Sequence, residues 1–321
     1  MRCFALACLL ASSSLTAHAM NEEDAWTLLQ KAAVAAHALN YQGVFVYQAG
    51  RQVKSVQITH YFNGQHEFAR NVILDGTPRE VFSQGGELTI LSPRNEKVVI
   101  EKRRGQNMFP AIIPTNLDAV KESYTLKADV MERVAGRPAQ LLHLTPKDGL
   151  RYSYRFWIDS EYGLLLKSSM FNARQEIMES IGFNQLSLLN TVDLDWFHPK
   201  IDSKKNYVME DEADKTIADN ATNSNWVIKD LPPGYRKVDQ MKRMVPGKPL
   251  PITHVVFSDG LASVSLFIEP LIRGTKPKSG HKLVGTTSFY ANVIDGYQII
   301  VVGEVPEATV SQIANAISFK K

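Results

Sequence analysis

Hydrophobic and polar residues alternate with a period of two along residues 41–189. Successive side chains of a strand point to opposite faces, so this period predicts β-structure. Dipeptides that favour the tight turns of hairpins interrupt the alternation. They are Ala49-Gly50, Asn63-Gly64, Asp75-Gly76 and Gly85-Gly86. The pattern therefore predicts consecutive hairpins, with about ten antiparallel strands in all.

A helical pattern precedes these strands. Asn21 is suited to an N-cap, and apolar residues then recur at the spacing of one helix face. These residues are Trp26, Leu29, Ala33, Ala36 and Leu39. A sheet of about ten strands twists and curls, so it has to close around something. We expect a large curled antiparallel sheet, shaped as a half-open barrel, with this helix as its plug.

Residues 132–171 show the strand pattern most clearly, as three apolar runs separated by short turns. In the middle run, alternation places Tyr152, Tyr154, Phe156 and Ile158 on one face and Arg151, Ser153, Arg155 and Asp159 on the other. One face is aromatic, and the other is expected to be solvated and basic. A concave aromatic face suits acyl chains. We predict that Tyr152, Tyr154 and Phe156 line a lipid site, or the opposite parity if the faces are exchanged.

Residues 103–117 are the exception to the strand pattern. Pro110 and Pro114 suit neither a central strand nor a helix interior. The segment is nevertheless rich in apolar side chains, namely Met108, Phe109, Ile112 and Ile113. Two interpretations stay open: a loop packed permanently on the mouth of the barrel, or a movable gate through which lipid enters.

Basic residues stand where this segment begins. Lys102, Arg103 and Arg104 follow one another, and a guanidinium group binds phosphate by charge-assisted hydrogen bonds. We predict that Arg103 and Arg104 contact a lipid phosphate at the hinge of the gate. The alternative is an ordinary solvated surface, because short charge runs are common there.

The chain divides into two domains. Residues 191–225 are charged and polar without periodicity, so we expect a linker between an N-terminal domain, 20–190, and a C-terminal domain, 226–321. In the second domain, strands are predicted at 235–244, 252–257, 261–269, 281–294 and 297–303. A helix follows Pro306, with one apolar stripe. The predicted fold is α+β, with a small antiparallel sheet and a C-terminal helix completing the molecule.

Residues 1–19 resemble a cleaved signal peptide, with an apolar run from Cys3 to Ala11 and small residues at the Ala17-His18-Ala19 end. That run is far shorter than the roughly 20 residues that span a bilayer. Both cysteines of the chain lie in it, so the mature protein is expected to lack disulfides. These features predict export of the chain from the cytoplasm.

Sequence motifs for chemistry are missing. The histidines form no H-E-x-x-H pattern, and the chain has no G-x-S-x-G, P-loop or G-x-G-x-x-G motif. His254, Ser258 and Asp259 suggest a triad, but their side chains diverge where a strand enters a tight hairpin. The net charge of +3 is too small for non-specific nucleic-acid binding. We expect no catalytic residues, no metal and no cofactor, and therefore not an enzyme.

Several motifs together resemble the RseB/MucB family of periplasmic regulators of the sigma-E envelope-stress response. In the first domain they are Glu132-Arg133-Val134-Ala135-Gly136-Arg137-Pro138, Asp148-Gly149 with Arg151-Tyr152, Phe156-Trp157-Ile158-Asp159 and Gly163-Leu164-Leu165-Leu166-Lys167. In the second they are His254-Val255-Val256-Phe257-Ser258-Asp259-Gly260 and Val301-Val302-Gly303-Glu304-Val305-Pro306. The resemblance covers nearly the whole mature chain.

The resemblance implies a LolA/LolB-like, lipid-sensing N-terminal domain and an RseB/MucB-type C-terminal domain. It implies a negative regulator of sigma-E (AlgU-type) signalling that binds the periplasmic part of the anti-sigma factor, RseA or MucA. Binding would protect that factor from site-one proteolysis until lipid or lipopolysaccharide releases it. For the anti-sigma contact we expect His254, Phe257 and Tyr290. The alternative function is a lipid or lipoprotein carrier of LolA/LolB type, and a homo-oligomer stays open.

Overall fold

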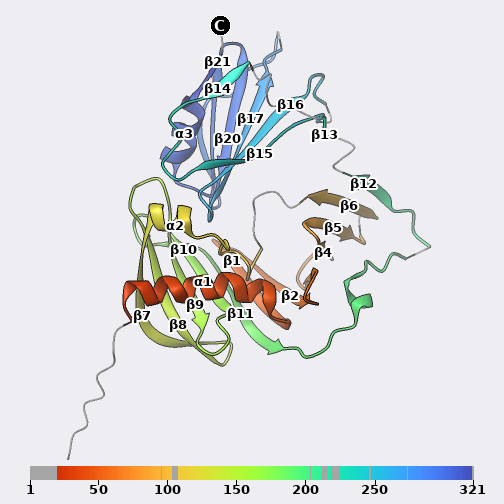
Figure 1. Ribbon diagram of the computed structural model, residues 1–321. Helices are drawn as coiled ribbons and strands as arrows, with labels where there is room; N and C mark the ends of the chain where they lie inside the picture. The colour runs from red at the N-terminus through yellow and green to blue at the C-terminus, as the bar shows by residue number, and fades with distance from the viewer. Residues whose placement is uncertain are drawn as a thin grey trace, which may run out of the picture.

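The computed structural model describes residues 20–94, 96–102, 108–202, 204–211, 216–217, 225–245, 247–272 and 274–319. Their strands form two large sheets, one above the other in Figure 1, and a small ribbon. The N-terminal sheet has 12 strands and the C-terminal sheet has 7. The predicted α+β class and its two sheets are confirmed.

The N-terminal sheet is an almost uninterrupted series of hairpins. Its strands are β1 (Tyr41–Ala49), β2 (Gln52–Phe62), β3 (Glu67–Ile73), β4 (Glu80–Gln84), β5 (Glu87–Ser92), β6 (Lys97–Lys102), β7 (Tyr124–Val134), β8 (Arg137–Pro146), β9 (Ser153–Asp159), β10 (Leu165–Phe171), β11 (Ile177–Leu188) and β12 (Val208–Asp211). Their order is β12-β6-β5-β4-β3-β2-β1-β11-β10-β9-β8-β7. Because β12 and β7 are both edges, the curled sheet stays open, as predicted.

Helix α1 (Glu22–Ala38) lies across the sheet, as Figure 1 shows. Its N-cap is Asn21, whose side-chain oxygen accepts a hydrogen bond of 2.8 Å from the backbone N–H of Asp24. The buried face consists mainly of small residues: Ala25, Leu29, Ala32, Ala33 and Ala36. Small side chains let the helix approach the sheet closely, so the helix fills the concave side as the predicted plug.

A carboxylate fixes the end of this helix. Glu67 on β3 lies 2.9 Å from Nδ1 of His37 and 3.1 Å from Nε2 of His60. Burial alone would raise the pKa of Glu67, but the hydrogen bonds and charges of both histidines hold it well below its usual value. The Nδ1 atom of His60 lies 2.8 Å from the Leu39 carbonyl oxygen. The helix end is thus bonded to two neighbouring strands.

The C-terminal sheet has the order β13-β15-β16-β17-β20-β19-β18. Its strands are β13 (Thr216–Ile217), β15 (Arg236–Arg243), β16 (Ile252–Ser258), β17 (Ser263–Pro270), β18 (Gly280–Val284), β19 (Thr287–Ile294) and β20 (Tyr297–Gly303). Helix α3 (Glu307–Asn315) packs on it through Val310, Ile313 and Ala314. A separate pair joins β14 (Trp226–Ile228) to β21 (Ile317–Phe319). The predicted C-terminal helix is therefore present.

The region expected to be a linker carries some structure of its own. A 3₁₀ turn, η1 (Leu194–Phe197), packs against β3. The indole N–H of Trp196 donates a 3.2 Å hydrogen bond to the Thr59 hydroxyl, and the Arg70 guanidinium lies 4.2 Å from the indole ring. Further on, β12 pairs in parallel with β6. The polar composition of this segment did not predict the contacts of η1, because only two aromatic residues, Trp196 and Phe197, make them.

One buried ion pair joins the two domains. Arg151, just before β9, is only 4% exposed, and its Nε–H donates a 2.8 Å hydrogen bond to Asp259 in the β16–β17 turn. The same guanidinium also donates to Asp148 and to the carbonyl of Pro233. Burial alone would lower the pKa of Arg151, but Asp259 raises it. The solvated face predicted for Arg151 is wrong, because the second domain covers it.

Asp259 holds its own turn while it binds Arg151. It is fully buried, and its Oδ1 accepts hydrogen bonds of 3.0 and 2.8 Å from the N–H groups of Leu261 and Ala262. A further contact joins the domains nearby, since the Thr309 hydroxyl donates a 2.6 Å hydrogen bond to the Leu150 carbonyl. Buried charges are costly unless paired. The relative position of the domains therefore depends on this pair.

We predict that limited trypsin treatment cuts after Lys200, Lys204 or Lys205, which are exposed, and yields two fragments that elute together in gel filtration. In Asp259→Asn the fragments should separate, and the uncut variant should lose about 3–5 kcal/mol of unfolding free energy, because the buried Arg151 loses its fully buried carboxylate partner and keeps only the partly exposed Asp148. Glu122→Gln is the control, since it removes only the exposed 3.6 Å pair with Arg236. Wild-type fragments that separate at once would contradict this interface.

Candidate functional site

A cavity of about 420 Å³ lies between the two domains. Inward-facing residues of β9, β10 and β11 form one wall, and the β16–β17 turn with the end of β20 forms the other. The lining residues are Ile112, Tyr154, Ser168, Met170, Glu179, Gly260, Leu261, Ala262, Ser263, Ser265, Thr287, Val302, Gly303 and Glu304. Both domains are needed to enclose it.

Strand register explains the first wall. Tyr154 on β9 is opposite Met170 on β10, and Met170 is opposite Glu179 on β11. Directly paired residues share a face of the sheet, so all three point to the concave side. The parity of β11 continues to Ile181 and Phe183, which pack into the N-terminal core. Glu179 is therefore a carboxylate on the apolar side of its strand.

A close backbone approach explains the second wall. Gly260, in the turn that Asp259 holds, has a φ of +100°, a conformation that L side chains rarely adopt. A Cβ atom there would lie 3.3 Å from a methyl carbon of Val120 and 3.4 Å from Cγ of Pro114. Glycine thus lets the turn of the second domain rest against residues 108–123. Leu261 beside it packs on the core of the first domain.

The cavity carries two carboxylates, one from each domain. Burial and the charge of Glu304 raise the pKa of the Glu179 carboxyl to about 7, while a hydrogen bond with Tyr47 acts in the opposite direction. Burial and Glu179 in turn raise the pKa of the Tyr47 hydroxyl, so this group keeps its proton and donates. Glu304 is exposed at the mouth, and its Oε1 accepts a 3.0 Å hydrogen bond from the Thr286 hydroxyl.

The structure places the predicted aromatic residues as follows. Tyr154 lines the interdomain cavity, whereas Phe156 is fully buried in the N-terminal core. Their rings stack with centroids 5.7 Å apart. Tyr152 is half-buried and lines a second interdomain cavity, of about 380 Å³, near Pro306. All three side chains lie toward the C-terminal domain or the core. The inner face of β9 is therefore the one that carries Tyr152, Tyr154 and Phe156, not the opposite face.

The segment with the two prolines is part of the core where the structure describes it. The ring of Phe109 lies 5.1 Å from that of Phe45 and 5.0 Å from that of Phe183. Ile113 is 1% exposed, Ile112 lines the interdomain cavity and Met108 is half-buried. Arg103 and Arg104 lie outside the described residues. The short helix α2 (Asp118–Ser123) then leads into β7.

The three residues expected at the anti-sigma contact do not form one surface. His254 stacks on Phe267 with ring centroids 4.4 Å apart, and its Nε2 lies 3.0 Å from the Ser265 hydroxyl. Phe257 is 1% exposed in the second core, so its side chain offers no surface to a partner. Tyr290 is half-buried against His281. Ser258 bonds its own turn, so no triad forms around His254.

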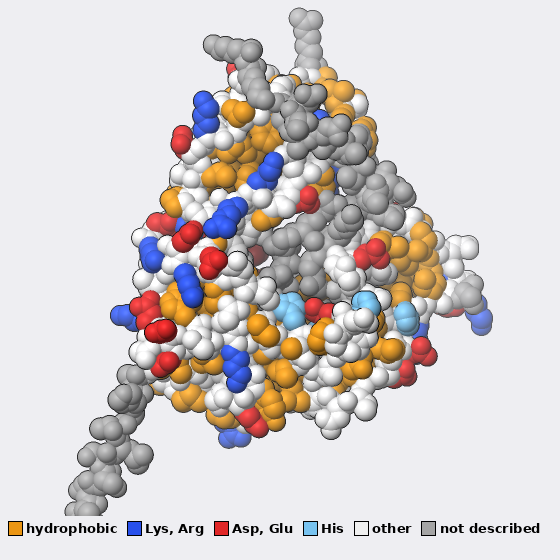
Figure 2. Space-filling view, in the orientation of Figure 1, with side chains coloured by type: hydrophobic (Ala, Val, Ile, Leu, Met, Phe, Trp, Pro, Cys, Tyr) orange, Lys and Arg blue, Asp and Glu red, His pale blue; other side chains and the backbone are white. Residues whose placement is uncertain are grey.

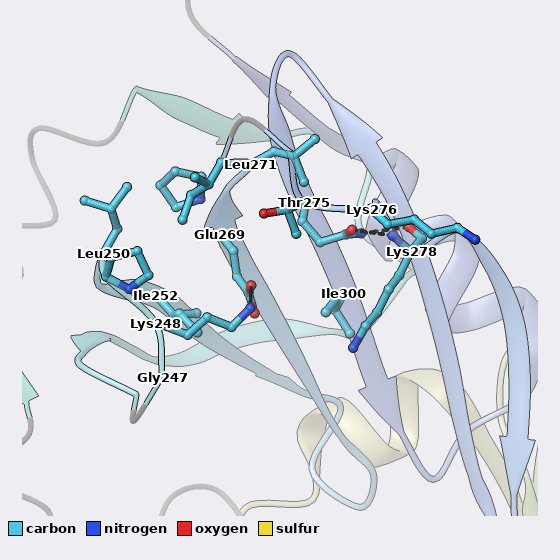
Figure 3. A pocket seen from close by; sticks show the side chains of 14 residues that line it. Gly247, Lys248, Leu250, Ile252, Glu269, Leu271, Thr275, Lys276, Lys278 and Ile300 are labelled. Atoms are coloured by element: carbon cyan, nitrogen blue, oxygen red, sulfur yellow. Dashed lines mark hydrogen bonds and ion pairs between the residues drawn. The ribbon is translucent and has the colours of Figure 1, made fainter.

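A third cavity, of about 240 Å³, lies at one end of the C-terminal sheet and is shown in Figure 3. Lys248 forms a 2.6 Å ion pair with Glu269, and Ile252 and Ile300 line the cavity beside this pair. Lys276 and Lys278 also line it. Sequence reasoning missed this cavity, because it forms where the irregular segments 247–250, 271–272 and 274–278 meet the ends of β16, β17 and β20, and periodicity does not predict that meeting.

Neither a candidate metal cluster nor a candidate membrane-spanning helix is found in the described part of the chain. No group of three or more His, Cys, Asp or Glu residues there is placed to hold a metal ion. No helix there is long and apolar enough to cross a membrane. The interdomain cavity presents apolar surfaces, hydroxyl groups and two carboxylates.

Both domains match known protein families. The model of the MucB/RseB N-terminal domain matches residues 24–201, and that of the MucB/RseB C-terminal domain matches residues 220–318. The chain belongs to the MucB/RseB family. The resemblance inferred from the sequence motifs is confirmed.

Relatives match over nearly their whole length. The sigma-E factor regulatory protein RseB of Salmonella typhimurium is 27% identical over 322 residues, covering 99% of this chain and 98% of the relative. The sigma factor AlgU regulatory protein MucB of Pseudomonas aeruginosa is 28% identical over 314 residues, covering 96% and 95%. These relatives are named as regulatory proteins.

Solved structures of the MucB/RseB family share the fold. A crystal structure of MucB in complex with MucA(peri) has a TM-score of 0.73 and 26% identity, and covers 92% of this chain and 99% of that one. A crystal structure of MucB has a TM-score of 0.65 and 27% identity, and covers 93% and 98%. Both domains are included in these matches.

We predict a specific pH dependence of stability from Glu179. Its pKa of about 7 exceeds its ordinary value of 4.5, so between these pH values the folded chain holds more protons than the unfolded chain. Its contribution therefore makes unfolding free energy fall as pH rises through this window, and level off above it. Glu179→Gln should remove that contribution and stabilise the protein at pH 8 by on the order of 1–3 kcal/mol.

Urea unfolding of both proteins at pH 5, 6, 7 and 8 measures this difference. Glu87→Gln, an exposed carboxylate on β5, is the control and should follow the wild type at every pH. A constant difference between Glu179→Gln and the wild type would contradict the raised pKa.

Proposed function

We propose that this chain is a periplasmic negative regulator of sigma-E (AlgU-type) signalling, which binds the periplasmic part of an anti-sigma factor of the RseA/MucA kind. One observation carries the proposal: the similarity to MucB bound to MucA(peri), which spans both domains. The regulatory names of full-length relatives support it. The cavity enclosed by both domains is a further feature that suits a binding protein.

Periplasmic localisation is part of the same proposal. The partner segment in the related complex is periplasmic by its name, MucA(peri). Residues 1–19, which lie outside the described residues, have the composition of a cleaved signal peptide. A regulator of an anti-sigma factor acts where that segment is exposed, so export of the chain is required by this function.

The proposed mechanism is steric protection. A bound polypeptide cannot enter the active site of the site-one protease, so cleavage of the anti-sigma factor waits for its release. Lipid or lipopolysaccharide would cause release by binding this chain in a conformation with lower affinity for the partner, since a ligand shifts an equilibrium only by its differential affinity. The element that changes has to contact both a lipid site and the domain interface.

The segment from Met108 to Leu117 meets that requirement. Phe109 and Ile113 fill the concave face that an acyl chain would occupy, whereas Ile112 and Pro114 contact or face the turn of the second domain. Burial of an acyl chain contributes about 0.8 kcal/mol per methylene, so part of one chain can displace these side chains. We propose that this displacement is the gate, and that it moves the second domain through Gly260 and Leu261.

Binding to a purified periplasmic segment of a MucA-type anti-sigma factor tests the function. We predict a stable complex with the full chain, and at least roughly tenfold weaker binding when the chain ends at Asp219, because the second domain supplies one wall of the interdomain site. Calorimetry gives both affinities, and circular dichroism checks that the shortened chain is folded. Equal affinities would contradict a contribution from the second domain. Lipoprotein transfer without complex formation would instead support the carrier function.

Two single substitutions test the gate. Phe109→Ser should lower the unfolding free energy by about 3–5 kcal/mol, because a core aromatic ring is lost. Ile112→Ser, at the half-buried edge of the same segment, should leave the chain folded but change the concentration of lipopolysaccharide fragments that releases the partner. Release is followed by fluorescence of a labelled anti-sigma segment. An unchanged lipid response in folded Ile112→Ser would show that the segment only completes the core.

A further inference from the structure

The charged residues of the interdomain cavity have one sign. Among its described lining residues, Glu179 and Glu304 are the charged ones, and neither forms an ion pair in the described part of the chain. Elsewhere acidic and basic side chains are mixed, as on the face shown in Figure 2. At the same interface Arg151 and Asp259 are paired at 2.8 Å. The cavity is thus a place where the interface leaves negative charge uncompensated.

The two carboxylates are held in place by neutral donors. The Tyr47 hydroxyl bonds to Glu179, and the Thr286 hydroxyl donates to Oε1 of Glu304. A carboxylate has room for about four hydrogen bonds in all, so both keep acceptor sites for a ligand. Glu304 is exposed at the mouth and Glu179 lies deeper on the sheet. Their arrangement would draw a cation inward.

The walls fit the shape of a long basic side chain. Tyr154, Met170 and Leu261, which line the same cavity, contribute apolar surface to it. Lysine and arginine have an aliphatic stem that packs on such surfaces, with the charge at its end. The volume of about 420 Å³ also leaves room for several waters, at roughly 30 Å³ each.

Other cations fit less well. A metal ion needs more ligands than two carboxylates, and the described residues hold no group of three. A zwitterionic lipid headgroup would bring its phosphate beside its amine, against two negative charges. A lone basic side chain on a polypeptide brings the positive charge without an anion.

We propose that the cavity between Glu179 and Glu304 receives one lysine or arginine side chain of the polypeptide that this chain binds. This inference rests on the proposed function and adds the chemistry that the partner has to present. Because the two carboxylates come from different domains, the inserted cation also bridges the domains beside the Arg151–Asp259 pair. Any movement that separates the domains then weakens partner binding.

The test uses the full chain and the periplasmic segment of a MucA-type anti-sigma factor. Calorimetry at pH 7.5 should show roughly 10- to 100-fold weaker binding for Glu179→Gln with Glu304→Gln. Glu87→Gln is the matched control. Each lysine and arginine of the segment is then replaced by glutamine. Replacement of the inserted residue should weaken binding to the wild type by the same factor, and should change binding to the double variant little.

A pH series separates insertion from a merely structural effect. Beside Glu179, the titratable groups facing this site are Glu304, Tyr47 and Tyr154, and the tyrosines stay neutral. Wild-type affinity should rise between pH 6 and 8 as Glu179 loses its proton, and the double variant should lose this dependence. A folded double variant with wild-type affinity would overturn the proposal. So would a result in which every glutamine replacement in the partner segment weakens binding to the double variant as much as it weakens binding to the wild type.

Failure of the proposed function is recognised separately, since the wild type would then bind no anti-sigma segment. In that case a second experiment still tests whether the cavity binds a basic side chain. The full chain is titrated with Nα-acetylarginine methylamide, and the carboxyl ¹³C shift of Glu179 is followed. A saturable shift that Glu304→Gln weakens supports the cation site. No shift of the Glu179 carboxyl overturns it.

Discussion

The buried pair between Arg151 and Asp259 is the interaction on which the rest of the molecule depends. Asp259 both shapes the β16–β17 turn and binds a cation from the other domain. If the β16–β17 turn left the interface, Asp259 would lose Arg151 and its carboxylate would be exposed. Through Gly260 and Leu261, the same turn rests on the first domain and encloses the interdomain cavity. One ion pair thus fixes the interface and forms a cavity wall.

The proline segment connects the lipid hypothesis to this interface. Its aromatic residue, Phe109, belongs to a cluster with Phe45 and Phe183 in the core, so it is no loose lid. Yet Ile112, three residues later, faces the second domain. Close-packed interiors transmit displacement to their neighbours. In the proposed gate, a ligand that enters the first core at Phe109 changes the contacts of the second domain without touching it.

Periodicity predicted what depends on the local chain. The alternation from Tyr41 to Leu189 gave the strands, and Asn21 marked the start of the helix. It could not predict what depends on packing between domains, so Arg151 was expected in solvent although it is buried. Glu179 was missed, although a carboxylate with the parity of Ile181 and Phe183 is a readable signal. The aromatic contacts of Trp196 likewise need partners distant in sequence.

The two pairs of charged groups at the interface have opposite consequences. Arg151 and Asp259 carry opposite charges and attract each other across their 2.8 Å contact. Glu179 and Glu304 repel each other, and this repulsion adds to the effect of burial in raising the pKa of Glu179. The Arg151–Asp259 pair thus holds the domains together. Glu179 and Glu304 form no ion pair in the described part of the chain, so their negative charge at the interface stays uncompensated. An interface built this way can be stable alone and still gain stability from a partner, as a binding regulator requires.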